Sequence, residues 1–351
     1  MLPQSPPPPQ SPSATPKARI KMIVAWTVGL ALLAWLLSHT PFSEVREAIT
    51  RPSIGIWALT LCGLLLSYGL RAARLQVVLA LDDHTRAPRR WLGLRTDSLR
   101  VILMHNAAVN LLPMRAGELS FPWLASRELN LPLPRAVACL LWMRVQDLIV
   151  LVTLGVLLWP GVPLVWRAAA LAAMVLGWWM VSWGMRLWYG QHPESSATAP
   201  TAPTPPAGKV TQVLQRLRHA LLEPAHHRPM AWLLTLANWS VKLAAGACLL
   251  SAISGSNWGT AWSGALGGEL AAVVPLQGPA GFGTYEAGVW AGMAAHLSAT
   301  SPALALAVSA ALALHVCFLL CAVFAGALAW LLSQLPSSPS PQRGHPPRGT
   351  P

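Results

Sequence analysis

A few charged side chains stand inside long apolar stretches of this sequence. Arg144 and Asp147 are three residues apart on one predicted helix, so their side chains share a face. Glu118 and Glu286 each follow a stretch broken by proline and glycine, and each opens a new helix. A charge at the centre of a bilayer costs at least about 2.5–3.5 kcal/mol, so these residues need partners or a wet cavity. They indicate ion pairing or recognition of a charged ligand.

Two interpretations of these residues remain open. Arg144 could offer its planar guanidinium to a phosphate while Asp147 orients it, or the two could form a structural ion pair that locks helices together. Glu118 and Glu286 could cap helix N-termini, where the helix dipole favours a carboxylate. Alternatively, backbone N–H groups freed at the two breaks could bind an anion, with Arg115 as counter-charge. We take Arg115, Glu118, Arg144, Asp147 and Glu286 as the candidate substrate-binding residues.

Other polar residues at depth are less specific. Lys242 lies inside an apolar segment, and we expect it to pair with an acid. The remaining candidates are Glu269, His105, His296 and His315. Nothing in the sequence resembles a phosphate-binding loop, a nucleophile–histidine–acid triad or a metal spacing, and the five cysteines form no disulfide or zinc pattern. We therefore expect no catalytic residues, no metal and no cofactor.

Composition points to the membrane. Hydrophobic residues make up 54% of the chain and charged residues only 11%, whereas soluble domains have about a quarter charged residues. The apolar runs are roughly 17 to 28 residues long, enough for a helix to cross about 30 Å of hydrocarbon. The net charge of +13 comes from Lys and Arg in the gaps between these runs. This distribution reflects membrane topology and argues against nucleic-acid binding.

The predicted fold is an all-α polytopic membrane protein. Six full spans are expected, at 20–38, 54–81, 136–159, 166–189, 230–253 and 302–335. The first span follows a basic stretch without a convincing cleavage site, so we interpret it as retained. The Pro-rich ends 1–19 and 336–351 are expected to be disordered.

A cytoplasmic linker, 190–229, separates the first membrane half, 20–189, from the second, 230–335. Within the linker, segment 209–223 has an apolar face and a cationic face. It is either an amphipathic helix lying on the membrane surface or an ordinary solvated helix.

Two pairs of weaker segments decide the architecture. The pairs are 99–112 with 118–131 and 262–274 with 284–297, and a 14-residue helix covers only about 21 Å. Each pair is therefore predicted to form a re-entrant hairpin, 99–131 and 262–297, although two full spans per pair remain possible. The hairpin breaks are at Pro113, Gly117, Pro275, Gly278, Gly281 and Gly283.

The distribution of positive charge sets the orientation. With both termini cytoplasmic and both hairpins re-entrant, only Arg167 and the two arginines of a short mixed-charge loop after the first span, Arg46 and Arg51, lie outside. Arg144 and Lys242 lie within spans, and Arg71 and Arg74 lie at the cytoplasmic end of span 54–81. The first hairpin then enters from the cytoplasm and the second from outside. Two broken elements of opposite orientation are typical of an inverted-repeat transporter.

Three ordered motifs carry a family resemblance: NLLPMRAGE at 110–118, RVQD at 144–147 and PLQGPAGFGTYEA at 275–287. Through them the sequence resembles the UPF0104 family, which is similar to the transmembrane, flippase-like region of lysylphosphatidylglycerol synthase. The resemblance implies a bacterial inner-membrane protein with a lipid-flipping role. Three residues depart from the family pattern: Met143 replaces an acidic residue, Ala280 a glycine, and His315 an arginine. No segment suits the soluble aminoacyl-transfer domain of fused relatives, so we expect no lipid aminoacylation.

The preferred function is a lipid translocase that handles a polar or anionic lipid through its headgroup. One alternative is a non-transporting membrane partner, or scaffold, of a lipid or envelope biosynthesis enzyme. Another is a proton-coupled transporter of a small anion, with Asp147 or Glu286 as the proton carrier.

Overall fold

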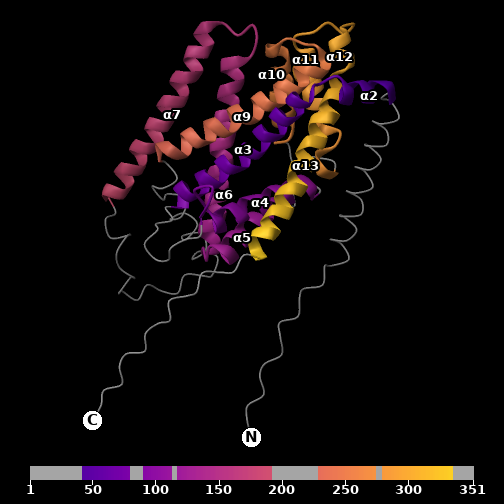
Figure 1. Ribbon diagram of the computed structural model, residues 1–351. Coiled ribbons are helices and arrows are strands. Elements are labelled where there is room, and N and C mark those ends of the chain that lie inside the picture. Colours follow the sequence, from indigo (N-terminus) through magenta and orange to yellow (C-terminus); the bar gives the residue numbers. More distant parts are fainter. Residues whose placement is uncertain (1–41, 80–89, 113–116, 192–227, 274–278, 335–351) are drawn as a thin grey trace, which may run out of the picture.

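The computed structural model is helical and describes residues 42–79, 90–112, 117–191, 228–273 and 279–334 (Figure 1). Several predicted features lie outside these residues: both terminal tails, the first span 20–38, the linker segment 209–223, and Pro113, Arg115, Pro275 and Gly278. The other predicted elements can be compared with the structure directly.

Among the described residues, four helices are long and apolar enough to cross a membrane. They are α3 (Ile54–Leu79), α6 (Leu133–Leu158), α9 (Pro229–Ser254) and α13 (Ala307–Gln334). At 26 to 28 residues each, these helices are about 40 Å long, more than the hydrocarbon thickness. Helix α7 (Leu164–Gln191) is equally long, and its stretch Leu164–Gly177 is apolar. Four of the six predicted spans are thus confirmed as apolar helices of spanning length.

The weaker segments form short helices on either side of each predicted break. The first pair is α4 (Thr96–Leu111) and α5 (Ser120–Glu128). The second is α10 (Trp258–Ala271) and α11 (Thr284–Ala294), with the 3₁₀ turn η4 (Pro279–Gly281) between them. In Figure 1, α4 and α5 lie at one end of the molecule and α10 and α11 at the other.

Small residues let the two helices of the second pair come very close. A Cβ atom on Gly288 would lie 2.5 Å from both the Cβ of Ala271 and the carbonyl oxygen of Gly267. Gly117 has a similar role in the first pair, because a Cβ there would overlap the backbone of Ala108 on α4. The glycines in these segments therefore hold each pair together as well as break the helices.

The neighbours of the short helices match between the two halves. Helix α3 packs against α9; α4 packs against α13 and α10 against α6; α5 packs against α6 and α11 against α13. These contacts are preserved when α3, α4, α5 and α6 are exchanged with α9, α10, α11 and α13. The two sets of four helices are thus equivalent in these contacts.

Some local expectations were wrong. The mixed-charge segment expected as a loop is helix α2 (Phe42–Thr50), and Arg51 after it donates to the carbonyl of Ile253 at the end of α9 (2.6 Å). The basic stretch after α3 includes a hairpin of two short strands, β1 (Arg90–Trp91) and β2 (Leu94–Arg95). The last span is preceded by a separate short helix, α12 (Pro302–Ala305).

The largest correction concerns two cations on α3. Arg71 and Arg74 were assigned to the cytoplasmic end of the second span with other topology-setting charges. Both do lie on this helix, α3, but Arg74 is buried inside the protein. Positive charge alone cannot separate a loop cation from one that faces the protein interior.

Candidate functional site

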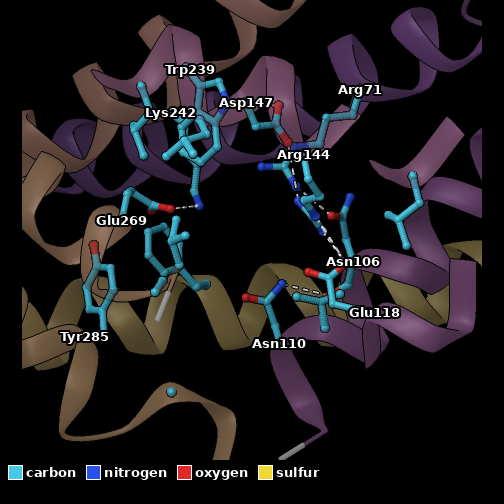
Figure 2. A pocket seen from close by; sticks show the side chains of 18 of the residues that line it. Arg71, Asn106, Asn110, Glu118, Arg144, Asp147, Trp239, Lys242, Glu269 and Tyr285 are labelled. Atoms are coloured by element: carbon cyan, nitrogen blue, oxygen red, sulfur yellow. Dashed lines mark hydrogen bonds and ion pairs between the residues drawn. The ribbon is translucent and has the colours of Figure 1, made fainter. Parts of the chain in front are cut away.

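A cavity of about 520 Å³ lies between the two sets of helices (Figure 2). Both hairpins contribute to its wall, the first through Glu118 and the second through Ala280 and Gly281. Its polar and aromatic lining comprises Arg71, Asn106, Asn110, Glu118, Arg144, Asp147, Trp239, Lys242, Glu269, Tyr285, His315 and Phe318. The cavity therefore brings charged groups from both halves of the chain into an otherwise apolar protein.

Arg144 joins the first hairpin to α6. Its Nη2 and Nε atoms donate to Glu118 Oε2 at 2.8 and 3.1 Å, and its Nη1 donates to Asp147 Oδ2 at 3.3 Å. The predicted Arg144–Asp147 pair is confirmed, but Glu118 is the closer partner. Arg144 thus ties the residue after the first break to the helix that follows the hairpin.

His105 on α4 supports this arrangement as a neutral imidazole. Its Nε2 lies 3.4 Å from Arg144 Nη2, and a guanidinium can only donate, so Nε2 must accept. The hydrogen is then on Nδ1, which donates to Ser120 Oγ (3.0 Å), and Ser120 Oγ donates to the carbonyl of Gly117 (2.6 Å). This chain of hydrogen bonds fixes the turn that presents Glu118.

Asp147 is buried at the centre of a network of donors. Arg74 Nη1 donates to its Oδ1 at 2.6 Å, and the Trp239 indole N–H donates to the same oxygen at 3.0 Å. With Arg144 on Oδ2, this carboxylate has donors from α3, α6 and α9. Sequence reasoning missed Arg74, the closest partner of Asp147.

A second ion pair lies across the cavity from Arg144 (Figure 2). Lys242 Nζ on α9 donates to Glu269 Oε2 on α10 at 2.7 Å, which confirms that Lys242 pairs with an acid. The ammonium also lies 4.7 Å from the ring centre of Phe318. Lys242 thus combines an ion pair with a cation–π contact at this side of the cavity.

Glu286 lies behind the cavity wall and does not line it. One carboxylate oxygen accepts from the backbone N–H of Gly283 (2.7 Å), which is the N-cap of α11, so the capping interpretation holds for this residue. The other oxygen lies 2.6 Å from Nδ1 of His315, whose ring lines the cavity. Glu286 therefore reaches the cavity only through His315.

The hydrogen bonds of His315 show that this pair shares a proton. Nε2 lies 2.8 Å from the carbonyl oxygen of Ala280, which can only accept, so Nε2 carries a hydrogen. The Nδ1 contact with Glu286 needs a second hydrogen between the two atoms. The proton is held either as imidazolium with carboxylate or as neutral imidazole with carboxylic acid.

The second break uses residues in left-handed conformations. Gly281 and Gly283 have φ of 84° and 81°, which explains glycine at both positions. Ala280, which replaces a glycine of the family pattern, also has a positive φ of 54°. The departure from the pattern thus leaves the turn in place, with alanine in a conformation that glycine adopts more readily.

Arg71 was also missed by sequence reasoning. Its Nη1 donates to Asn106 Oδ1 at 3.0 Å and its Nε to Asn238 Oδ1 at 3.2 Å, while the guanidinium lies over the Trp239 ring at 5.6 Å. It forms no ion pair with a carboxylate in the part of the chain that the structure describes. The sequence contained one signal for these two residues: Arg71 and Arg74 are three positions apart, as are Arg144 and Asp147.

Of the five candidate residues, Glu118, Arg144 and Asp147 line the cavity together. Glu286 lies behind His315, which lines it. Arg115 lies outside the described residues. Among the residues that the structure does describe, no group of three or more His, Cys, Asp or Glu could hold a metal ion.

Comparison with known proteins identifies the family. No curated protein sequence matches the chain. The family model of the lysylphosphatidylglycerol synthase transmembrane region matches residues 22–326, a range that contains all three motifs and every cavity residue named above. Together with the four apolar helices of spanning length, this match makes the chain a multi-pass membrane protein. The chain belongs to the family of the lysylphosphatidylglycerol synthase transmembrane region.

Proposed function

We propose that this protein is a lipid translocase of the bacterial inner membrane that moves a polar or anionic lipid between leaflets. The observation that supports this most is the charged cavity at the meeting point of the two hairpins. A translocase must shelter a polar headgroup while the acyl chains stay in an apolar medium. A cavity with charged walls, framed by long apolar helices, meets both requirements.

The proposed mechanism treats both short-helix pairs as re-entrant hairpins of an inverted repeat, with both termini cytoplasmic. In its favour, each short helix is below spanning length, the pairs lie at opposite ends of the molecule, and their neighbours are equivalent. The main ties are equivalent too. Arg144 joins α6 to the start of the first hairpin's second helix, and His315 joins α13 to the same place in the second hairpin.

In this mechanism the headgroup occupies the cavity while one hairpin or the other closes it off. Arg144 and Glu118 contact the headgroup at the first hairpin, near Arg115, and Asp147 holds Arg144 in position. Glu286 acts through His315 at the second hairpin. Exchange between the two closures would open the cavity to each leaflet in turn.

Reconstitution tests the proposal. Full-length protein in proteoliposomes should accelerate leaflet exchange of a native phospholipid, measured by chemical modification of headgroups accessible from outside. Arg144→Ala should lower the rate about ten-fold or more, because it removes the cation that ties Glu118 into the cavity.

The matched control is Arg100→Ala. Arg100 also forms an ion pair, with Glu128 at 3.0 Å, but it does not line the cavity. The leaflet-exchange rate of the Arg100→Ala variant should stay near that of the wild type. Equal leaflet exchange in protein-containing and empty vesicles, for every native lipid tested, would contradict the proposal.

A further inference from the structure

The charges around the cavity are paired unequally. Each carboxylate there has a cationic or proton-sharing partner: Glu118 and Asp147 have Arg144, Asp147 also has Arg74, Glu269 has Lys242 and Glu286 has His315. Arg71 is the cation left over within the described cavity wall. The site therefore has one unpaired positive charge and no unpaired carboxylate among these residues.

Two asparagines hold Arg71 in a way that leaves further donors free. Because a guanidinium can only donate, Asn106 and Asn238 must turn their carbonyl oxygens toward Arg71 and their NH₂ groups away from it. Both Nδ2 atoms are buried and have no hydrogen-bond partner. Asn106, only 2% exposed, also lines the cavity.

A third unused donor lies on the far side of the cavity. The hydroxyl of Tyr285, a residue 4% exposed, is buried without a hydrogen-bond partner. Leaving such a group unpaired costs about 1–3 kcal/mol, so a ligand that supplies acceptor oxygens is favoured. Arg71 adds its Nη2, which donates to no described residue.

From these observations we infer that the cavity recognises the phosphate diester of an anionic phospholipid, with Arg71 as the anchor, and disfavours cationic headgroups. The inference rests on the proposed function and specifies its substrate class. Arg71 presents a planar fork suited to two phosphate oxygens, and Asn106, Asn238 and Trp239 hold that fork in place. A cationic headgroup would meet carboxylates that already have partners.

One acceptor in the cavity suits a hydroxyl-bearing headgroup. Asn110 Nδ2 donates to the backbone carbonyl oxygen of Asn106 at 2.7 Å, and Figure 2 shows the side-chain oxygen of Asn110 directed toward the middle of the cavity. A neutral amide oxygen can accept from a glycerol hydroxyl without adding charge. Phosphatidylglycerol combines this hydroxyl with a single negative charge, so it is the probe of choice.

Binding to the full-length protein in detergent can be counted by native mass spectrometry. Four probes separate the alternatives: phosphatidylglycerol, a neutral glycosyl diacylglycerol, lysyl-phosphatidylglycerol and inorganic phosphate. We expect phosphatidylglycerol to bind at least about ten-fold more tightly than either other lipid. Tighter binding of the lysyl lipid or equal binding of the glycolipid would overturn the inference, as would binding of inorganic phosphate without the lipid.

Three variants test the anchor. Arg71→Gln should weaken phosphatidylglycerol binding about ten-fold or more, while Arg71→Lys, which keeps the charge but loses the fork, should fall between it and the wild type. Asn106→Asp nearly preserves shape and gives Arg71 an internal carboxylate, so it should weaken binding without disturbing the fold. If Arg71→Gln does not fold, Asn106→Asp still tests whether Arg71 anchors the lipid. Arg100→Gln, outside the cavity, should bind like the wild type.

The leaflet-exchange assay separates this inference from the proposed function. If lipid binding depends on Arg71 but the protein causes no leaflet exchange, the binding site is supported and the translocase function is contradicted. If Arg71→Gln and Asn106→Asp change neither leaflet exchange nor phosphatidylglycerol binding, the translocase function is supported and the role of Arg71 as anchor is contradicted.

Discussion

Most charged side chains at the cavity belong to individual ion pairs, and the free-energy cost of breaking a pair depends on how deeply it is buried. Removing one partner of a buried pair strands the other in a medium of low polarity, which typically costs 3–5 kcal/mol. Removing both partners often costs much less, because no uncompensated charge remains. The Lys242–Glu269 pair, with side chains 16% and 7% exposed, is the clearest case.

We expect Lys242→Met to destabilise the protein by about 3 kcal/mol because it strands Glu269. The double variant Lys242→Met, Glu269→Gln should recover most of that loss. Thermal unfolding in detergent measures the stability of the single and the double variant. Glu47→Gln breaks the exposed pair with Arg51 and should shift the melting temperature little. A double variant as unstable as the sum of its single changes would contradict the pairing.

The candidate residues could be predicted only in part from the sequence, for reasons specific to each residue. Glu118, Arg144 and Asp147 stand in apolar segments at spacings that imply contact. Arg71 and Arg74 stand near the end of an apolar run, where a cation normally faces the headgroups. Which way they turn depends on packing between α3 and its neighbours. Hydropathy along one helix does not contain that information.

At the scale of elements, the second hairpin depends on backbone contact between α10 and α11. The two helices approach closely at Gly267, Gly288 and Gly292, and a side chain at any of these glycines would have to push the helices apart. Packing between small residues is a common source of helix association in membranes, where apolar burial gives little driving force.

Gly288→Ala should therefore destabilise the protein by about 1–3 kcal/mol, since its Cβ would lie 2.5 Å from the Cβ of Ala271. The same substitution at Gly177 on α7, where a Cβ would meet nothing within 4 Å, serves as the control. Gly177→Ala should be neutral or slightly stabilising, because alanine favours helix. Equal melting temperatures for the two variants would show that α10 and α11 are not in backbone contact.

The elements themselves were largely predictable because runs of apolar residues and Pro/Gly breaks are local signals. The ends of α3, α6, α9 and α13 fall within a few residues of the expected ones. Helix α2 was not predicted, since its nine residues of mixed polarity have no apolar run. Its position depends on a contact distant in sequence, from Arg51 to the end of α9.

At the scale of the whole molecule, the proposed topology makes a prediction about sidedness. If both hairpins re-enter, the two ends of one hairpin lie on the same side of the membrane, and the two hairpins lie on opposite sides. If each pair consists of two full spans, the ends still share a side, but the break lies on the other side.

Single cysteines in a background lacking the five native ones test this arrangement. Trp91→Cys, before the first hairpin, and Arg127→Cys, in the last turn of α5, should be modified by a membrane-impermeant thiol reagent from the cytoplasm. Trp258→Cys and Ala299→Cys, which flank the second, should be modified from outside. A cysteine at position 115 in the first break should be modified from the cytoplasm or not at all. Modification there from outside would indicate two full spans and contradict re-entry.

The two equivalent ties differ in their hydrogen bonding. Between Arg144 and Glu118, a guanidinium can only donate and a carboxylate can only accept, so the roles are fixed. Between His315 and Glu286, either atom of the contact can be the one that carries the hydrogen. In the proposed repeat, one hairpin is thus held by a contact with a fixed donor and acceptor, and the other by a contact in which the two roles can be exchanged.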